Sequence, residues 1–490
     1  MEADVVDGAR FLVVPMAILG GIVGSFLNVV IFRLPRDLSV MRPRWSFCPH
    51  CKHRIRPYDN VPIFGWLWLR GRCRDCGTAI SSLYPLIECL TSLLFVMTWD
   101  ALFVGGTPPP VAGAAPSLAI GWPIAVAYGV LFSGLLANAA MDIESYTIDI
   151  RVTFFTMAMG VACHTVAWWG TGEASAADAE AFGVAVPPAL CLVGVAMGIA
   201  WGLTALIASR VRSHARQSGE IVPVAADVSG IQTYDDTVTP LRTDDESRFR
   251  PLPVLAMLGV LGALAAWQVL APNRGAAMPL SPVGQRGFVA GLLFFFALIL
   301  ASMVHREADE QIVEDIESER HGARATAWRE LAGVLPALLV GIAALTYLRH
   351  GGSAAQTWNA WLGSATPYMV GPIVSISGLV FAAGLGWAVR ILGTLSFGKE
   401  AFGSGDIYIL AAIGAVGGFW LVVFGFFLAA LLALVGVLAT IFHKANRAIP
   451  FGPWLALGAF VAMYLYGPLV TTFAPLGRLL LWVLTGEPAI

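Results

Sequence analysis

Charged side chains are scarce in this sequence. Only 13% of its 490 residues are charged, 57% are hydrophobic, and the mean hydropathy is +0.73. A soluble chain carries roughly 25% charged residues, so the composition excludes an ordinary soluble protein. The net charge is only −2 and no basic tail is present, which leaves no electrostatic basis for a nucleic-acid partner. The composition predicts an all-α, polytopic transmembrane bundle.

A signal-peptide cleavage site is also missing. The first apolar stretch begins at Phe11 and runs past Phe26 without an A-x-A sequence, so it predicts a retained span in the lipid bilayer. Since a span needs about 20 apolar residues, the chain offers about twelve candidates, of which the tenth is short. They are 11–32, 82–104, 118–141, 152–170, 187–208, 252–271, 287–304, 331–348, 369–393, 407–419, 421–442 and 452–472.

The basic residues of the loops predict the orientation of these spans. Loop 33–79 has a large excess of arginine over acidic residues, which places it in the cytoplasm and the N-terminus outside. Counting onward puts loops 105–117 and 171–186 outside. The charged segments 209–251 and 305–330 fall inside, where they are typical of a disordered linker and a solvated helix.

Four of the seven cysteines form two C-x-x-C pairs, Cys48 with Cys51 and Cys73 with Cys76. Two such pairs at this separation indicate a tetrahedral zinc site, because four thiolates complete a closed shell. The alternative is two disulfides or a redox pair, which a cytoplasmic loop disfavours. A closed site has no vacancy for a substrate, so we expect structural zinc in a small lobe.

Two acids lie at the ends of apolar runs. Asp142 ends the third predicted span, and Asp406 opens the tenth within Gly403-Ser404-Gly405-Asp406. Ionisable side chains at membrane depth are costly, so they are candidates for chemistry. Paired carboxylates, one ionised and one protonated, would activate water and polarise a carbonyl. We expect Gly403 and Gly405 to let the backbone turn and a substrate strand approach. The pattern predicts an intramembrane aspartic peptidase.

Other interpretations of these acids stay open. Asp406 would also serve as a helix N-cap, and Asp142 as an interfacial acid in a polar turn. Glu144 or Asp149 would replace Asp142 in the pair equally well on sequence alone. A proton-coupled transporter is a further alternative, but it predicts acids near the middle of the bilayer.

Several motifs resemble those of the type IV prepilin peptidase family, in the family's order. The opening motif is Gly24-Ser25-Phe26-Leu27-Asn28-Val29-Val30-Ile31-Phe32-Arg33-Leu34-Pro35, and the two cysteine pairs follow it. The later motifs are Tyr84-Pro85-Leu86-Ile87-Glu88, Gly403-Ser404-Gly405-Asp406 and Pro450-Phe451-Gly452-Pro453. The resemblance covers roughly 1–170 and 369–472.

The resemblance implies an aspartic peptidase that removes the basic leader from type IV prepilin or pseudopilin precursors at the cytoplasmic face of the bacterial inner membrane. Many members then methylate the new N-terminus with S-adenosylmethionine. By matching position, Asp142 and Asp406 are the expected catalytic pair, and Cys48, Cys51, Cys73 and Cys76 the zinc ligands. Asn28 and Glu88 are assigned to substrate recognition or methylation, or else to helix packing.

The sequence departs from the family's pattern in three ways. No proline precedes Asp149, Tyr408 stands where a lysine is usual, and 187–348 adds four spans to an eight-span pattern. The first two departures keep open a catalytically altered relative that acts in pilus or secretion assembly. The expected units are a first span (1–32), the zinc lobe (33–81), a core segment with Asp142 (82–170), an inserted segment (171–368) and a core segment with Asp406 (369–490).

Overall fold

The computed structural model describes residues 11–104, 118–145, 147–169, 323–350, 367–442 and 450–466, with 469, 472 and 473. The predicted spans 187–208, 252–271 and 287–304 and the loops 171–186 and 209–251 lie outside these residues. The described residues contain no strand; they form helices and, near the cysteines, two isolated β-bridges. The predicted all-α class is therefore confirmed for the described part of the chain.

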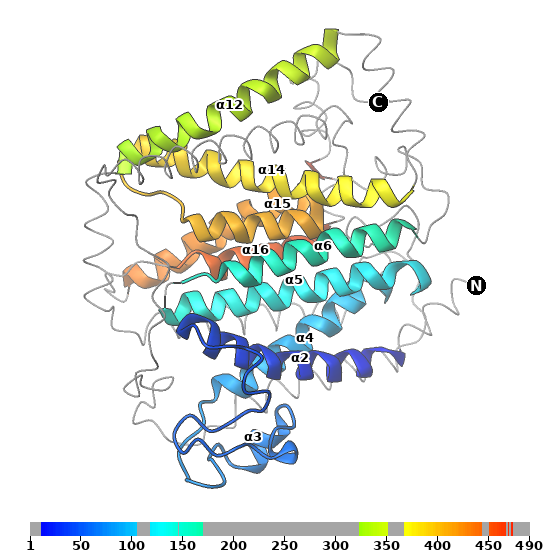
Figure 1. The fold of residues 1–490 in the computed structure, drawn as a ribbon, viewed down its shortest axis with the longest axis vertical. Helices are drawn as coiled ribbons and strands as arrows, with labels where there is room; N and C mark the ends of the chain where they lie inside the picture. The colour runs from blue at the N-terminus through cyan, green and yellow to red at the C-terminus, as the bar shows by residue number, and fades with distance from the viewer. Residues whose placement is uncertain are drawn as a thin grey trace, which may run out of the picture.

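Long apolar helices lie side by side in this part of the molecule (Figure 1). They are α2 (Val13–Arg33), α4 (Leu83–Trp99), α5 (Leu118–Ser145), α6 (Ile150–Trp169), α12 (Ala323–His350), α14 (Pro367–Phe397), α15 (Ser404–Phe442) and the shorter α16 (Gly452–Tyr464). Among the described residues, six helical stretches are long and apolar enough to cross a membrane, and α12 and α16 are not among them. The total of about twelve spans stays a prediction.

Small residues allow the first two long helices to pack closely. A side chain at Gly20 or Gly24 of α2 would lie 2.6 Å from the Ser92 Cα or 2.7 Å from the Glu88 Cα of α4. Without water to drive helices together, close backbone packing of this kind holds helices in lipid. The α2–α4 pair is therefore a rigid support for the residues that connect the two helices.

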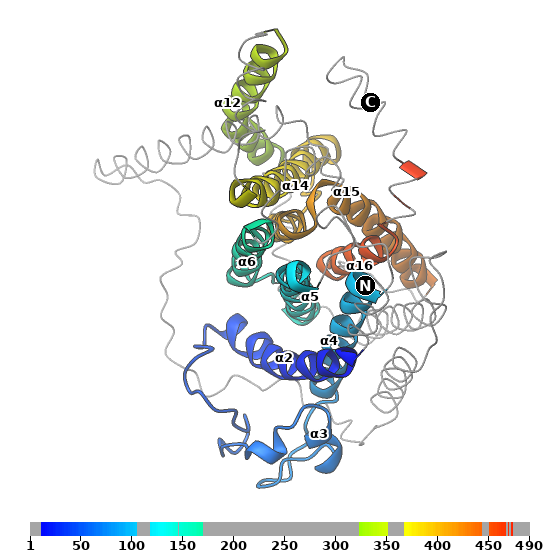
Figure 2. The same ribbon diagram turned by 90° about the vertical axis from the view of Figure 1, so that its right-hand side faces the viewer.

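α15 reverses direction within its length. Gly418 has φ 69° and ψ −169°, which is not helical, and the rings of Phe402 and Phe426 lie 6.0 Å apart. A straight helix would separate two residues this distant in the chain by more than about 30 Å. The chain therefore folds back near Gly418, as expected from the separate apolar segments 407–419 and 421–442. α16 lies beside both α15 and α5 (Figure 2).

A small lobe connects α2 to α4. It contains the short turns η1 (Leu34–Arg36) and η2 (Pro57–Asp59) and the short helix α3 (Phe64–Trp68). Asp59 holds it together through a two-pronged ion pair with Arg74, with N–O distances of 2.8 and 2.5 Å. Figure 1 places the lobe beside α2.

Candidate active site and metal centre

Asp142 is buried near the end of α5, where it holds the start of α16. The Gly452 backbone N–H donates to Asp142 Oδ2 at 3.1 Å. A side chain at Gly452 would stand only 2.7 Å from the same oxygen, so glycine is the residue that fits. This contact joins residues 310 positions apart and gives the P-F-G-P motif, which sequence reasoning left without a role, a place in the site.

Asp406 is buried in the first turn of α15. Its carboxyl group accepts a hydrogen bond from the Gly403 backbone N–H, as an acid at the third helical position does. The other oxygen, Oδ1, is buried and has no hydrogen-bond partner among the described residues. Helix capping therefore accounts for one oxygen of Asp406. Burial of the second oxygen without a hydrogen bond is unfavourable unless a ligand or a water molecule donates one to it.

The structure brings Asp142 and Asp406 into one site. Ile409 lies one helical turn beyond Asp406, and its Cδ1 is 3.5 Å from where a Gly452 side chain would begin. The rings of Phe402 and Phe451, just before the two helices, lie 5.7 Å apart. The two carboxyl groups are close enough for their charges to interact. Two acids from distant parts of the sequence thus meet where α5, α15 and α16 converge.

The two glycines before Asp406 serve packing more than backbone freedom. Neither Gly403 nor Gly405 is among the described residues with positive φ. A side chain at Gly405 would come within 2.9 Å of Ile148, in the short connection between α5 and α6. The space that we expected for a substrate strand beside Gly405 is thus occupied by the chain's own Ile148.

The alternative acids differ in their surroundings. Asp149 forms an ion pair with Arg151 at 2.7 Å, and its N–H donates to the Asn138 side chain at 2.9 Å. Arg151 also donates to the Leu34 carbonyl at 2.9 Å, tying this connection to the end of α2. The Glu144 side chain lies outside the described residues. Asp149 therefore has a cationic partner in Arg151.

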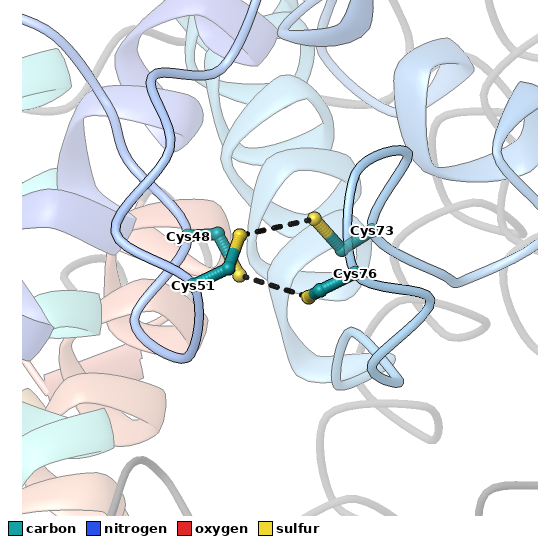
Figure 3. Close-up of side chains that lie close together, drawn as sticks. All are labelled: Cys48, Cys51, Cys73 and Cys76. Atoms are coloured by element: carbon teal, nitrogen blue, oxygen red, sulfur yellow. Dashed lines mark hydrogen bonds between the residues drawn. The ribbon is translucent and has the colours of Figure 1, made fainter.

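The four cysteines converge in the lobe (Figure 3). All four Sγ atoms lie within 4.8 Å of one another, with Cys48 to Cys76 at 3.9 Å and Cys51 to Cys73 at 4.0 Å. A tetrahedral zinc ion with bonds of about 2.3 Å requires sulfur atoms about 3.8 Å apart. Disulfide-bonded sulfur atoms lie about 2 Å apart, so these distances do not fit the disulfide alternative. The donor set fits zinc.

Both cysteine pairs lie in turns of the same form. The Cys48 N–H donates to the His53 carbonyl and the Cys73 N–H to that of Thr78, at 2.9 and 2.8 Å. Burial raises the pKa of Cys48 to about 12, whereas the side-chain hydrogen bond with Thr78 lowers the pKa of Cys76 to about 6. A bound cation would offset the burial of Cys48, because metals bind the thiolate form.

Asn28 and Glu88 lie together on the lobe side of α2 and α4. Glu88 accepts the Ile63 N–H at 2.6 Å and hydrogen bonds from the Ser25 and Asn28 side chains, while Asn28 also donates to the Tyr84 carbonyl at 3.1 Å. They line a cavity of about 390 Å³ between the helices and the lobe, whose lining does not include Asp142 or Asp406. Both residues thus have structural partners here.

The fold and the site define a helical membrane protein with a pair of buried aspartates and a separate four-cysteine centre. A family model described as the bacterial peptidase A24 N-terminal domain matches residues 18–101. The chain is 40% identical to a prepilin leader peptidase/N-methyltransferase of Myxococcus xanthus, over 30% of this chain and 38% of the relative. It is 38% identical to a type 4 prepilin-like proteins leader peptide-processing enzyme of Escherichia coli, over 31% of this chain and 66% of the relative.

These matches identify the family. A prepilin leader peptidase/N-methyltransferase of Pectobacterium carotovorum is 33% identical, over 30% of this chain and 53% of the relative. The chain therefore belongs to the prepilin leader peptidase family. The alignments span from about two fifths to two thirds of these relatives' length. No solved structure matches the chain.

Proposed function

We propose that the protein is an intramembrane aspartic endopeptidase that cleaves the basic leader from type IV prepilin or pseudopilin precursors. The observation that carries this proposal is the pair of buried acids, Asp142 and Asp406, in one site. Related proteins named as prepilin leader peptidases supply the class of substrate. The proposal places the site at the cytoplasmic face of the bacterial inner membrane, because the lobe nearby is rich in arginine.

The chemistry follows from two acids that share one proton. The ionised carboxylate takes a proton from a water molecule, whose oxygen attacks the scissile carbonyl carbon. The protonated carboxyl polarises the carbonyl oxygen, and a proton then passes to the leaving amine. The Gly452 N–H holds one oxygen of Asp142, which fixes the direction in which the carboxyl group faces.

The positions of both acids argue against the transporter alternative. Asp142 lies in the last turn of α5, and Asp406 lies in the first turn of α15. A proton relay through the bilayer needs ionisable groups near the middle of the spans. Acids at the helix ends instead suit a substrate that is cut where an apolar helix meets a basic leader.

Methylation of the new N-terminus is the second part of the proposal, since the names of two of these relatives include it. S-adenosylmethionine would supply the methyl group. Asn28 and Glu88 are the residues that we assign to recognition of the substrate or the methyl donor, because both line the cavity beside the lobe. The four cysteines would hold a structural zinc ion and shape the wall of this cavity.

The direct test is cleavage of a pilin-like precursor by the purified protein, followed by mass spectrometry of the products. We expect Asp142→Asn and Asp406→Asn to abolish cleavage while the protein stays inserted and folded. Asp149→Asn is the matched control and should retain cleavage, because Asp149 pairs with Arg151. Cleavage by both of the first two variants would contradict the proposal. A wild-type protein that binds the precursor without cutting it would support the assembly role instead.

A further inference from the structure

The short helix α3 presents an apolar face that nothing in the described chain covers. Val61, Phe64 and Trp68 lie on this face, with exposures of 45%, 62% and 80%. Phe64 and Trp68 are four residues apart in α3, which puts them on one side of the helix, and the exposed Val61 lies just before it. The opposite side is buried, and Trp66 donates its ring N–H to the Ile80 carbonyl at 3.0 Å. Large aromatic side chains this exposed mark a surface that contacts something else.

α3 lies at the depth of a membrane-spanning helix. The Cβ of Pro62 is 3.4 Å from where a side chain at Gly21 would begin. Gly21 is in the middle of α2, about 18 Å along the helix from Arg33. Half of the hydrocarbon layer is about 15 Å thick. With Arg33 at the membrane surface, the contact between Pro62 and Gly21 therefore lies at the depth of the hydrocarbon layer. Figures 1 and 2 both show the lobe beside α2.

Two contacts hold α3 firmly at this depth. The buried Glu88 of α4 accepts the N–H of Ile63, the residue just before α3, at 2.6 Å. Ile63 has φ 66°, an unfavourable conformation for a β-branched residue that persists only where the surroundings enforce it. Within α3, Gly65 packs so closely on the Asp59 carbonyl that no larger residue fits.

We infer that α3 is a membrane anchor, and that Val61, Phe64 and Trp68 insert into the bilayer leaflet on the Arg33 side. The neighbouring face of α2 is itself exposed and apolar at Ile18 and Ile22, so one lipid-facing surface continues from α2 onto α3. The exposed Arg70 and Arg72 follow α3, where they meet phosphate head groups. Tryptophan with flanking arginine is typical of a membrane interface.

The inference changes the expected character of the lobe. The sequence placed loop 33–79 in the cytoplasm. With α3 anchored, Cys73 follows the inserted helix closely, so the metal centre is held against the bilayer. The cavity between lobe and helices then opens near the membrane surface, where an apolar substrate helix arrives.

Chemical labelling tests the anchor. Phe64→Cys, Trp68→Cys and the control Tyr58→Cys, which replaces a lobe residue that is 61% exposed, are reconstituted in proteoliposomes opened by freeze–thaw. A water-soluble, membrane-impermeant maleimide should react at least ten times more slowly at 64 and 68 than at 58. All three should react equally after denaturation in SDS. The labelling of the parent chain, which carries only the native cysteines, is subtracted from that of each variant. Equal rates in the vesicles would overturn the inference.

A spin label at the same positions separates lipid from protein as the cover. If α3 is in the bilayer, the label at 68 collides more often with oxygen, which concentrates in lipid, than with a water-soluble nickel complex. The label at 58 should show the reverse preference. A label at 68 that reaches the nickel complex freely, or that is shielded from both reagents by a protein partner, would overturn the anchor.

Discussion

Single contacts around the two acids decide the geometry of the site. Gly452 binds Asp142 through its N–H, Ile148 fills the space beside Gly405, and Gly403 holds one oxygen of Asp406. The first two contacts join an acid, or the residue before one, to another element, and the third lies at the start of α15. Small changes in side-chain size at these glycines should therefore move the carboxyl groups.

Gly405→Ala is expected to lower cleavage activity at least tenfold. The added methyl group would overlap Ile148, so the start of α15, and Asp406 with it, must shift; misplacement by about 1 Å is enough for a loss of this order. Gly384→Ala is the matched control, because nothing lies within 4 Å of a side chain there. Cleavage rates of both variants, measured beside their thermal unfolding, check the prediction. Wild-type activity in Gly405→Ala would contradict it.

The sequence identifies the acids better than their neighbours. Asp142 and Asp406 can be predicted because acids are rare in an apolar chain and these two stand at the ends of runs. Ile148 and Gly452 carry no such signal, since an isoleucine or glycine in an apolar protein is ordinary. Their roles arise only from tertiary contacts between distant segments, which local patterns do not encode.

At the scale of elements, α12 is fastened to the connection that leads to Asp406. Arg390 of α14 donates to Glu330 of α12 at 3.2 Å and to the Phe402 carbonyl at 2.8 Å, and it also pairs with Glu400. Arg324 of α12 packs against Gly398 in the same connection. α12, which falls in the segment predicted from the sequence to be an insertion, thus supports the connection that leads to Gly403–Asp406.

Glu330→Gln is expected to lower the free energy of unfolding by about 1–3 kcal/mol, because it removes the charge that faces the half-buried Arg390. Thermal unfolding in detergent measures the loss of stability. The cleavage rate should also fall if the connection between α14 and α15 loosens. Arg329→Gln, at an exposed position on the same helix, should leave both unchanged. Equal stability of the two variants would show that the ion pair contributes nothing.

The cysteine lobe gives a metal prediction at the same scale. We expect one zinc ion per purified chain, lost in Cys48→Ser and retained in Cys163→Ala, whose cysteine lies in α6 away from the lobe. Elemental analysis of the two variants checks this. The spacing of the cysteines was enough to predict the cluster. It could not predict α3, since three exposed apolar residues in a loop do not reveal their depth.

At the scale of the whole molecule, the described ends of several helices meet on one side. Arg151 links the α5–α6 connection to the end of α2, and Ile148 links it to the start of α15. The arginine-rich loop 33–79 predicts that this side is the cytoplasmic one. The sequence does not fix the boundary between the tenth and eleventh spans, because 407–419 is short and α15 reverses at a single glycine.

The orientation is testable with Ser39→Cys in the lobe and Lys399→Cys between α14 and α15, both at exposed positions. An impermeant maleimide should label both in inside-out membrane vesicles and neither in intact cells with a permeable outer layer. Both positions should give the same answer, because the structure puts them at one end of the bundle. Labelling from outside would reverse the proposed topology.

The central claim is that Asp142 and Asp406 act as one catalytic unit. The most direct measurement is kcat/KM for precursor cleavage in Asp142→Asn, Asp406→Asn and the double variant. We predict a loss on the order of 1,000-fold or more for each single variant and no further loss in the double variant, because either change disables the pair. Losses that multiply in the double variant, or a single variant that cleaves at the wild-type rate, would contradict the account.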